Sequence, residues 1–259
     1  MKESILGIPI DSLSLTDAVT KTLNFLGQKN LSQKNPKIIN AANANVLVLA
    51  QKDQLLKKAL TKSDILLPDG QGVVLASKIF GNGIIKEKVA GPDLFERLLE
   101  ETRKKNIKLK IFFLGTTKQT LEKIKVRIEK EFKNLKFFGY APPFKKNFSK
   151  KDSKKMITAI NKVRPEILAV GMTAPKQEKW IEENKKKLMC KIILNIGATF
   201  DWFAGVKKRC PPALRQFEAF YRFLFEPRRL FRRMIRSVFI FPLLLIRFWL
   251  IRSYKKFFE

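Results

Sequence analysis

An aspartate set between a proline and two glycines is the most promising group for proton transfer in this sequence. Asp69 lies in the segment Leu67-Pro68-Asp69-Gly70-Gln71-Gly72, where an apolar run typical of a buried strand ends and a helix is expected to begin. The glycines permit a tight turn and close approach of a ligand, and a carboxylate beside a helix start stays ionised and able to accept a proton. An N-cap aspartate that accepts hydrogen bonds from the first helical amides has the same pattern, so both roles stay open for Asp69.

The lack of histidine narrows the chemistry further. The chain of 259 residues has no histidine, so proton transfer falls to a carboxylate, lysine, tyrosine or cysteine. Neither of its two cysteines, Cys190 and Cys210, lies in a CxxC pair, which disfavours a disulfide framework or a structural zinc and favours a reduced, cytoplasmic setting. Asp64 and Asp69 form no obvious magnesium clamp, so we expect no metal site.

Two further turns place polar groups at the starts of expected helices. The segment Gly171-Met172-Thr173-Ala174-Pro175-Lys176-Gln177 follows an apolar run and is expected to present Lys176 and Gln177 at the rim of the site. A helix that starts at proline and has a polar first turn explains the same residues. The turn at Gly115 offers backbone amides to a phosphate, although a single glycine is a weak signal. The sequence contains neither GxGxxG nor GxxxxGK[ST], which disfavours ordinary dinucleotide and P-loop sites.

The elements that must position these turns alternate between strands and helices. Strands are expected at 38–40, 64–68, 109–114, 136–139, 167–171 and 192–197, and helices at 46–60, 72–80, 119–132 and 153–163. Several apolar runs end at glycine, as parallel strands do where they pass into a covering helix. The pattern predicts an α/β fold, a Rossmann-like parallel sheet flanked by helices. Ligands of such sheets bind beyond the carboxyl ends of the strands, which directs attention to the loops after Leu67, Leu114, Val170 and Ile196.

The positive charge of the chain is divided between two kinds of residue. The net charge is +30, from 53 Lys and Arg against 23 Asp and Glu. Residues 1–206, the expected α/β domain, carry mostly scattered lysines, which are typical of a solvated surface. Residues 207–259 form an expected C-terminal appendage whose cations are mostly arginine, the side chain better suited to bidentate contact with phosphate. The appendage is therefore expected to meet an anionic partner.

The appendage also has the pattern of a membrane-binding helix. Four arginines at helical spacing share one face, and apolar residues line another: Arg229, Arg232, Arg233 and Arg236 against Leu230, Phe231, Met234, Ile235 and Val238. As a helix, the apolar residues 238–251 would span about 21 Å, short of the roughly 30 Å hydrocarbon core. We therefore expect this basic amphipathic tail to lie in the interface of an anionic membrane. A helical lid on the protein, and a transmembrane helix starting near Met234, are the alternatives.

Five motifs in a fixed order resemble those of the WecG/TagA/CpsF glycosyltransferases. They are Asn40-Ala41-Ala42-Asn43, Leu67-Pro68-Asp69-Gly70-Gln71-Gly72, Val89-Ala90-Gly91-Pro92-Asp93-Leu94, Ala174-Pro175-Lys176-Gln177-Glu178-Lys179-Trp180, and Gly197-Ala198-Thr199-Phe200-Asp201 with Ala204-Gly205. In the tail, Arg209-Cys210-Pro211, Tyr221-Arg222 and Glu226-Pro227-Arg228-Arg229-Leu230 resemble the C-terminal appendage of that family. The resemblance covers nearly the whole chain.

The resemblance implies an inverting, metal-independent transferase at the inner face of the cell membrane. Such an enzyme moves an N-acetylmannosamine-type sugar from UDP to a polyprenyl-diphosphate-linked GlcNAc, in the synthesis of cell-surface polysaccharide or teichoic acid linkage units. It needs no cofactor besides the UDP-sugar donor. By similarity Asp69 is the base, Asn43 and Gln177 hold the sugar or acceptor, and Asp201 lines the nucleotide pocket.

The resemblance also assigns the cations that would offset the charge of UDP. They are Arg222, Arg229 and Arg232, whose spacing of seven and three places them on one side of the tail if Pro227 does not disturb the helical phase. The chain departs from the family at Ala41, often Thr, and at Lys88, often Arg, which keeps the charge but loses the bidentate fork. The residues do not decide whether the donor sugar is ManNAc, its uronic acid or glucose.

Two classes of protein without catalysis compete with this interpretation. A nucleic-acid-binding protein would use the positive charge, but it predicts aromatic residues interleaved with surface lysines, and the phenylalanines lie mostly in apolar runs and in the tail. A membrane scaffold with an α/β head has no use for Asp69 and Gln177 at strand ends. Neither explains the order of the motifs, so we expect no nucleic-acid partner. The tail leaves self-association into a homo-oligomer open.

Overall fold

The centre of the protein is a parallel sheet of six strands, in the order β4-β3-β8-β7-β5-β6. The computed structural model describes residues 1–28, 34–211, 215 and 218–258. The strands are β3 (Lys37–Ala42), β4 (Ile65–Pro68), β5 (Leu109–Gly115), β6 (Leu135–Tyr140), β7 (Ile167–Gly171) and β8 (Ile192–Asn195). Every pairing within this sheet is parallel. The predicted Rossmann-like α/β class is confirmed.

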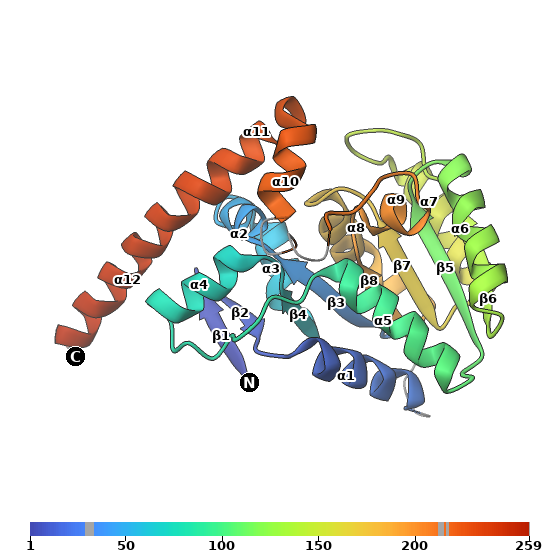
Figure 1. Ribbon diagram of the computed structural model, residues 1–259, viewed down its shortest axis with the longest axis horizontal. Helices are drawn as coiled ribbons and strands as arrows, with labels where there is room; N and C mark the ends of the chain where they lie inside the picture. Colours follow the sequence, from blue (N-terminus) through green and yellow to red (C-terminus); the bar gives the residue numbers. More distant parts are fainter. Residues whose placement is uncertain (29–33, 212–214, 216–217, 259) are drawn as a thin grey trace.

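Helices cover both faces of the sheet, so its central strands are buried on both sides (Figure 1). One face packs against α1 (Leu15–Gly27), α5 (Gly91–Lys104), α6 (Lys118–Glu131) and α9 (Thr199–Phe203). The other packs against α7 (Lys150–Val163) and α8 (Lys176–Asn184), the latter followed by a short 3-10 turn, Lys185–Lys187. Successive residues of β5 alternate between the two layers: Ile111 and Phe113 join the first, Phe112 and Leu114 the second.

A hairpin and three helices build a third apolar cluster at the β4 end of the sheet. The hairpin is β1 (Lys2–Ile5) with β2 (Ile8–Asp11), and the helices are α2 (Ala44–Ala50), α3 (Gln54–Thr61) and α4 (Gln71–Phe80). The single helix expected at 46–60 was wrong, because the chain breaks between α2 and α3. The side chain of Asp53 accepts a hydrogen bond from the Leu56 amide and so starts a new helix there.

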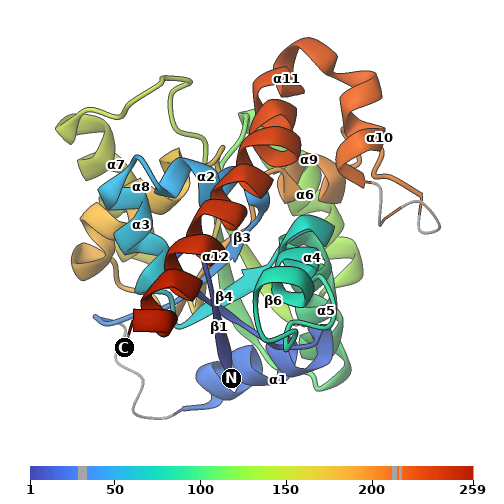
Figure 2. The ribbon, with the colours of Figure 1, turned by 90° about the vertical axis from the view of Figure 1, so that its left-hand side faces the viewer.

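The appendage is helical and lies against this third cluster. It consists of α10 (Glu218–Phe225), α11 (Pro227–Ile235), a π-helical turn at Arg236–Ile240 and α12 (Phe241–Phe258). Figure 2 shows α12 running diagonally across α2 and α4. Its buried Phe241 and Leu245 pack in the cluster, while Leu243 and Trp249 are exposed. One side of the tail is thus a lid on the protein, and the other side is an apolar surface open to solvent.

The tail helix is longer than the sequence predicted. Residues 230–251 form a helical stretch of 22 residues that is long and apolar enough to cross a membrane, judged by length and composition alone. The apolar length counted from the sequence, residues 238–251, was therefore too short, because the helix is continuous through the π-helical turn at Arg236–Ile240. The packing of Phe241 and Leu245 on the body holds this helix along the surface of the α/β domain.

Candidate functional site

Asp69 and Asn43 lie side by side because their strands are neighbours. The last residues of β3 and β4, Ala42 and Pro68, are paired in register, so the residues that follow emerge together at the carboxyl edge. Asn43 Nδ2 donates a hydrogen bond to Asp69 Oδ2 at 3.2 Å. Asn43 Oδ1 accepts one from the Val46 amide at 3.2 Å, as the N-cap of α2. This cap fixes which side of the Asn43 amide meets Asp69, so the carboxylate faces an N–H donor.

Asp69 itself does not cap a helix. The N-cap of α4 is Gly70, which has a φ of 103° and offers no side-chain hydrogen bond. A positive φ of this kind favours glycine, which explains the residue at this turn. The N-cap interpretation of Asp69 was therefore wrong. The half-buried carboxylate stays available at the strand end for another partner.

Lys88 connects the strand edge to the appendage. The Val89 amide donates to the Pro68 carbonyl at 2.8 Å, which holds this segment against the end of β4. The Lys88 ammonium donates to the Arg215 carbonyl and lies 4.0 Å from Glu218 Oε2. The structure thus brings Lys88 to the same edge as Asp69, where it contacts the tail.

An arginine of the tail is bound by an aspartate at the start of α5. Arg209 donates two hydrogen bonds to Asp93, Nη1 to Oδ1 at 2.8 Å and Nη2 to Oδ2 at 3.0 Å. Arg215 Nη1 lies 3.5 Å from the same carboxylate, and Glu218 Oε2 lies 3.8 Å from Arg209 Nη2. Burial lowers the pKa of Arg209, but the hydrogen bonds and charge of Asp93 outweigh it and the pKa is raised above its usual value. Arg209 is therefore a permanent cation in this cluster.

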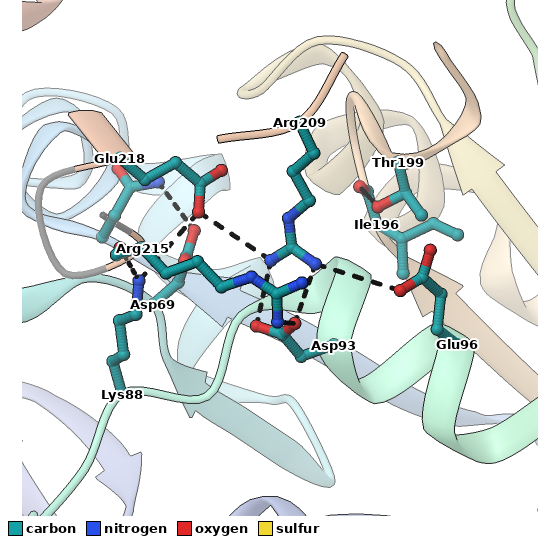
Figure 3. A network of polar contacts seen from close by, with 10 residues as sticks. Asp69, Lys88, Asp93, Glu96, Ile196, Thr199, Arg209, Arg215 and Glu218 are labelled. Atoms are coloured by element: carbon teal, nitrogen blue, oxygen red, sulfur yellow. Dashed lines mark hydrogen bonds and ion pairs between the residues drawn. The ribbon is translucent and has the colours of Figure 1, made fainter. Parts of the chain in front are cut away.

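Figure 3 shows how these groups gather at one place beside the end of β4: Asp69, Lys88, Asp93, Arg209, Arg215 and Glu218. Asp93, Arg209, Arg215 and Glu218 were not predicted from the sequence as site residues. Asp93 and Arg209 do lie in motifs that carry the family resemblance, but they are 116 residues apart, and nothing local pairs them. Their motif membership was the one signal by which they could have been found.

Gln177 lies deeper than the sequence predicted. It is buried at the first turn of α8, not presented at the rim. Its Oε1 accepts from the Met172 amide at 3.2 Å, and its Nε2 donates to Glu178 Oε1 at 2.8 Å. Burial raises the pKa of the fully buried Glu178 to about 7, against the lowering effect of that hydrogen bond. Gln177 and Glu178 therefore hold the loop that joins β7 to α8.

Asp201, the predicted nucleotide contact, lies in α9 next to residues that contact the tail. Its carbonyl oxygen accepts hydrogen bonds from the Val206 and Lys207 amides, which turn the chain out of α9. Two guanidinium groups make cation–π contacts with the ring of the next residue, Trp202. That of Arg222 lies 5.0 Å and that of Arg209 5.4 Å from the ring centroid. Arg222 is thereby placed near Asp201, as a member of α10.

Three other predicted residues have a different setting. Gly115 has a φ of 132°, and a Cβ there would overlap the Gly171 carbonyl oxygen, so this glycine permits the close approach of β5 and β7. Arg232 is exposed on α11. The side chain of Arg229 lies outside the described residues. Pro227 begins a new helix after Glu226, so Arg222 and Arg232 do not share one continuous helix face. The condition on which the common side of the tail arginines was predicted, an undisturbed helical phase at Pro227, is therefore not met.

The charges of the cluster define what it can do. Lys88, Arg209 and Arg215 can hold an anionic group such as a diphosphate, and Asp69 beside the Asn43 amide can accept a proton from a hydroxyl. Within the ranges that the structure describes, His, Cys, Asp and Glu form no group of three or more that could hold a metal ion.

Comparison with known proteins gives one consistent result. The model described as the Glycosyl transferase WecG/TagA/CpsF family matches residues 3–255. Three similar proteins are each named N-acetylglucosaminyldiphosphoundecaprenol N-acetyl-beta-D-mannosaminyltransferase. The protein of Bacillus spizizenii is 30% identical over 88% of this chain and 86% of its own, and that of Bacillus subtilis is 29% identical over 90% and 87%. The protein of Staphylococcus aureus is 25% identical over 93% and 90%.

Proposed function

Because the chain belongs to the WecG/TagA/CpsF family of glycosyl transferases, as its motifs predicted, we propose that it moves an N-acetylmannosamine-type sugar from a UDP-sugar to a polyprenyl-diphosphate-linked GlcNAc. The family and the names of the relatives make the chain a hexosyltransferase. Those names also support the acceptor. Synthesis of cell-surface polysaccharide or teichoic acid linkage units is part of the proposal. The nucleotide of the donor is part of the proposal.

The chemistry is a single displacement with inversion at the anomeric carbon. The acceptor hydroxyl attacks this carbon, a new C–O bond forms, and the bond to the UDP oxygen breaks with its electron pair going to UDP. Asp69 takes the proton of the attacking hydroxyl. The observation that carries this step is the Asp69 carboxylate at the carboxyl edge, with the Asn43 amide 3.2 Å away and no helix to cap. The Asn43 N–H donates to Asp69 Oδ2 and so orients the carboxylate.

Cations of the chain offset the charge that develops on the departing diphosphate. Lys88, Arg209 and Arg215 lie in the cluster with Asp69, where Asp93 and Glu218 balance their charge. A donor diphosphate would displace the Glu218 carboxylate from Lys88 and Arg209. Glu218 lies 4.0 Å from Lys88 and 3.8 Å from Arg209, so it is held more weakly than Asp93. With three side-chain cations at this place, we propose a reaction that needs no metal ion. Arg222, Arg229 and Arg232 are further candidates by similarity.

The enzyme acts at the inner face of the membrane in this proposal. The outer side of the tail exposes Phe239, Leu243, Ile246 and Trp249, and arginines precede them on α11. A helix held on the protein by one side and apolar on the other is suited to lying in the lipid interface. The lipid-linked acceptor would be met there, and the nucleotide-sugar donor would come from the cytoplasm.

The test is sugar transfer by the native protein and by Asp69→Asn, in detergent with EDTA. The donors are UDP-ManNAc, its uronic acid and UDP-glucose, and the acceptor is a short-chain polyprenyl-diphosphate GlcNAc. Loss of a general base lowers the rate by about 10²–10⁴-fold, with the thermal midpoint unchanged. The charge control is Glu129→Gln, an exposed acid on α6, which should keep the native rate.

Each alternative has its own outcome. A full rate in Asp69→Asn would remove Asp69 as the base, while leaving the transferase reaction intact. Activity that EDTA abolishes and magnesium restores would refute metal independence. No transfer from any donor, with the tail intact and lipid supplied, would refute the proposed substrates.

A further inference from the structure

A second candidate for membrane contact lies outside the tail, in the loop between β6 and α7. Residues 141–149 follow the carboxyl end of β6, so they emerge at the same edge of the sheet as Asp69. In Figures 1 and 2 this yellow-green loop projects at the end of the molecule where α11 lies. In the sheet order, β6 and β4 are the two outermost strands. The loop and the tail therefore flank the edge that carries the site.

The loop is anchored at its base. Lys176, the first residue of α8, donates to the Lys145 carbonyl at 2.8 Å, and its ammonium lies 4.5 Å from the centroid of the Phe148 ring. Phe148 packs against the second layer of the core. Ser149 and Asp152 form a capping box that starts α7, and Asp152 also pairs with Lys145 at 3.1 Å. The exposure of the tip is therefore a property of a fixed loop.

The tip combines an exposed aromatic ring with clustered positive charge. Phe144 is 107% exposed, although it belongs to a residue type that is usually buried. It follows Pro142 and Pro143, which restrict the backbone on its N-terminal side. Exposed lysines follow it in the sequence: Lys145, Lys146, Lys150, Lys151, Lys154 and Lys155. Asp152 is the only acid between residues 141 and 155.

This combination fits an anionic lipid surface. An apolar ring gains free energy when it enters the acyl boundary, and lysines gain from anionic headgroups, about 1 kcal/mol each near the surface. Long lysine side chains extend to the headgroups while an apolar neighbour inserts. A binding face for single-stranded nucleic acid needs several aromatic platforms along a groove, whereas the tip presents one exposed ring.

We propose that the Phe144 loop, residues 141–149, is a second membrane contact that inserts Phe144 into an anionic bilayer. With the tail on the opposite side of the site, two contacts fix the carboxyl edge toward the lipid surface. The contact itself is independent of the reaction. Its use, presenting Asp69 to a lipid-linked acceptor, rests on the proposed function.

A fluorophore at the tip tests the contact directly. Both native cysteines are buried, so Phe144→Cys supplies an exposed thiol for an environment-sensitive nitrobenzoxadiazole label. The matched control is Val126→Cys, an exposed apolar position on α6. Vesicles of phosphatidylglycerol and phosphatidylcholine are compared with phosphatidylcholine alone, and binding is measured in parallel by cosedimentation. We expect a blue shift and brighter emission at position 144 with the anionic vesicles, and no change at position 126.

Unlabelled variants measure the strength of the contact. Phe144→Ala should lower partitioning to anionic vesicles about tenfold, and Lys146→Gln about fivefold, whereas Lys123→Gln on α6 should change it less than twofold. Unchanged emission at position 144 on sedimenting protein, equal changes at 144 and 126, or no vesicle binding would each overturn the proposal. A shift with a single-stranded oligonucleotide but not with vesicles would assign the loop to nucleic acid instead. No sugar substrate is present, so a failure here is distinct from a failure of the transfer assay.

Discussion

The ion pair between Arg209 and Asp93 should hold the start of the appendage on the α/β domain. Both side chains are largely buried, with 11% and 20% of their surface exposed, and two hydrogen bonds join them at 2.8 and 3.0 Å. Asp93→Asn removes the charge and leaves one amide oxygen to accept from Arg209, where two carboxylate oxygens accepted before. The next carboxylates, Glu218 and Glu96, lie 3.8 and 4.0 Å from the guanidinium.

The size of the effect follows from these contacts. A hydrogen bond between charged groups contributes about 1.5–3 kcal/mol, so we expect docking of the segment that follows Gly205 to weaken by about 2 kcal/mol, or about thirtyfold. Glu96→Gln is the matched control, because Glu96 is 39% exposed and lies 4.0 Å from the same arginine. Such a pair contributes 0–1 kcal/mol, at most about fivefold.

Limited proteolysis measures this docking. Trypsin cleaves after Lys207 and Lys208 when the segment opens locally, and at low protease the rate follows the opening equilibrium. Cleavage should be about thirtyfold faster in Asp93→Asn, and transfer activity should fall because the tail cations leave the site. Equal cleavage rates in Asp93→Asn and Glu96→Gln would refute this account. So would a fall in the global unfolding midpoint large enough to explain the faster cleavage.

Three other perturbations test separate parts of the structure. Burial raises the pKa of Glu178 to about 7 in the folded protein, against 4.5 for an unperturbed glutamate, so the native state holds a proton that the unfolded state releases. Its contribution of about 3 kcal/mol is therefore present below pH 4.5 and lost as the pH rises to 7, and Glu178→Gln should remove that loss in denaturant titrations at pH 5.5 and 8. Gly115→Ala should destabilise by about 1–3 kcal/mol in thermal unfolding, while Gly27→Ala, which meets no atom within 4 Å, should be nearly neutral. Leu245→Ala should destabilise by about 2–3 kcal/mol because it is buried, whereas Leu243→Ala, 66% exposed, should keep the unfolding midpoint and weaken vesicle cosedimentation.

Local pattern was enough for the class of fold. The strand at 167–171 and the helix at 72–80 agree with β7 and α4 to within a residue, because a buried strand leaves a continuous apolar run and a helix with one buried face leaves a helical period. The helix at 46–60 failed for the converse reason. The apolar period continues across residues 46–60, but the Asp53 side chain caps a new helix and so interrupts the first one. Apolar periodicity alone does not indicate where a side chain competes with the backbone for hydrogen bonds.

The site shows the same division. From sequence, Asp69 could be placed at a strand end beside two glycines, and the family motifs could be read in order. The sequence left open whether Asp69 caps a helix, and the structure assigned that place to Gly70. In the structure the Gln177 amide is also buried, where it accepts from the Met172 amide, and Arg209 pairs with Asp93.

What the sequence alone determined was the alternation of elements, the acid at the end of β4, the family motifs and the basic apolar tail. Each of these depends on residues close together in the chain. The tertiary structure alone decided that Asn43 meets Asp69, that Arg209 meets Asp93, and that Phe241 and Leu245 hold the tail on the body. Asn43 and Asp69 are 26 positions apart in the sequence, and Arg209 and Asp93 are 116 positions apart. These contacts follow from strand order and from which surfaces pack together, and no local spacing encodes either.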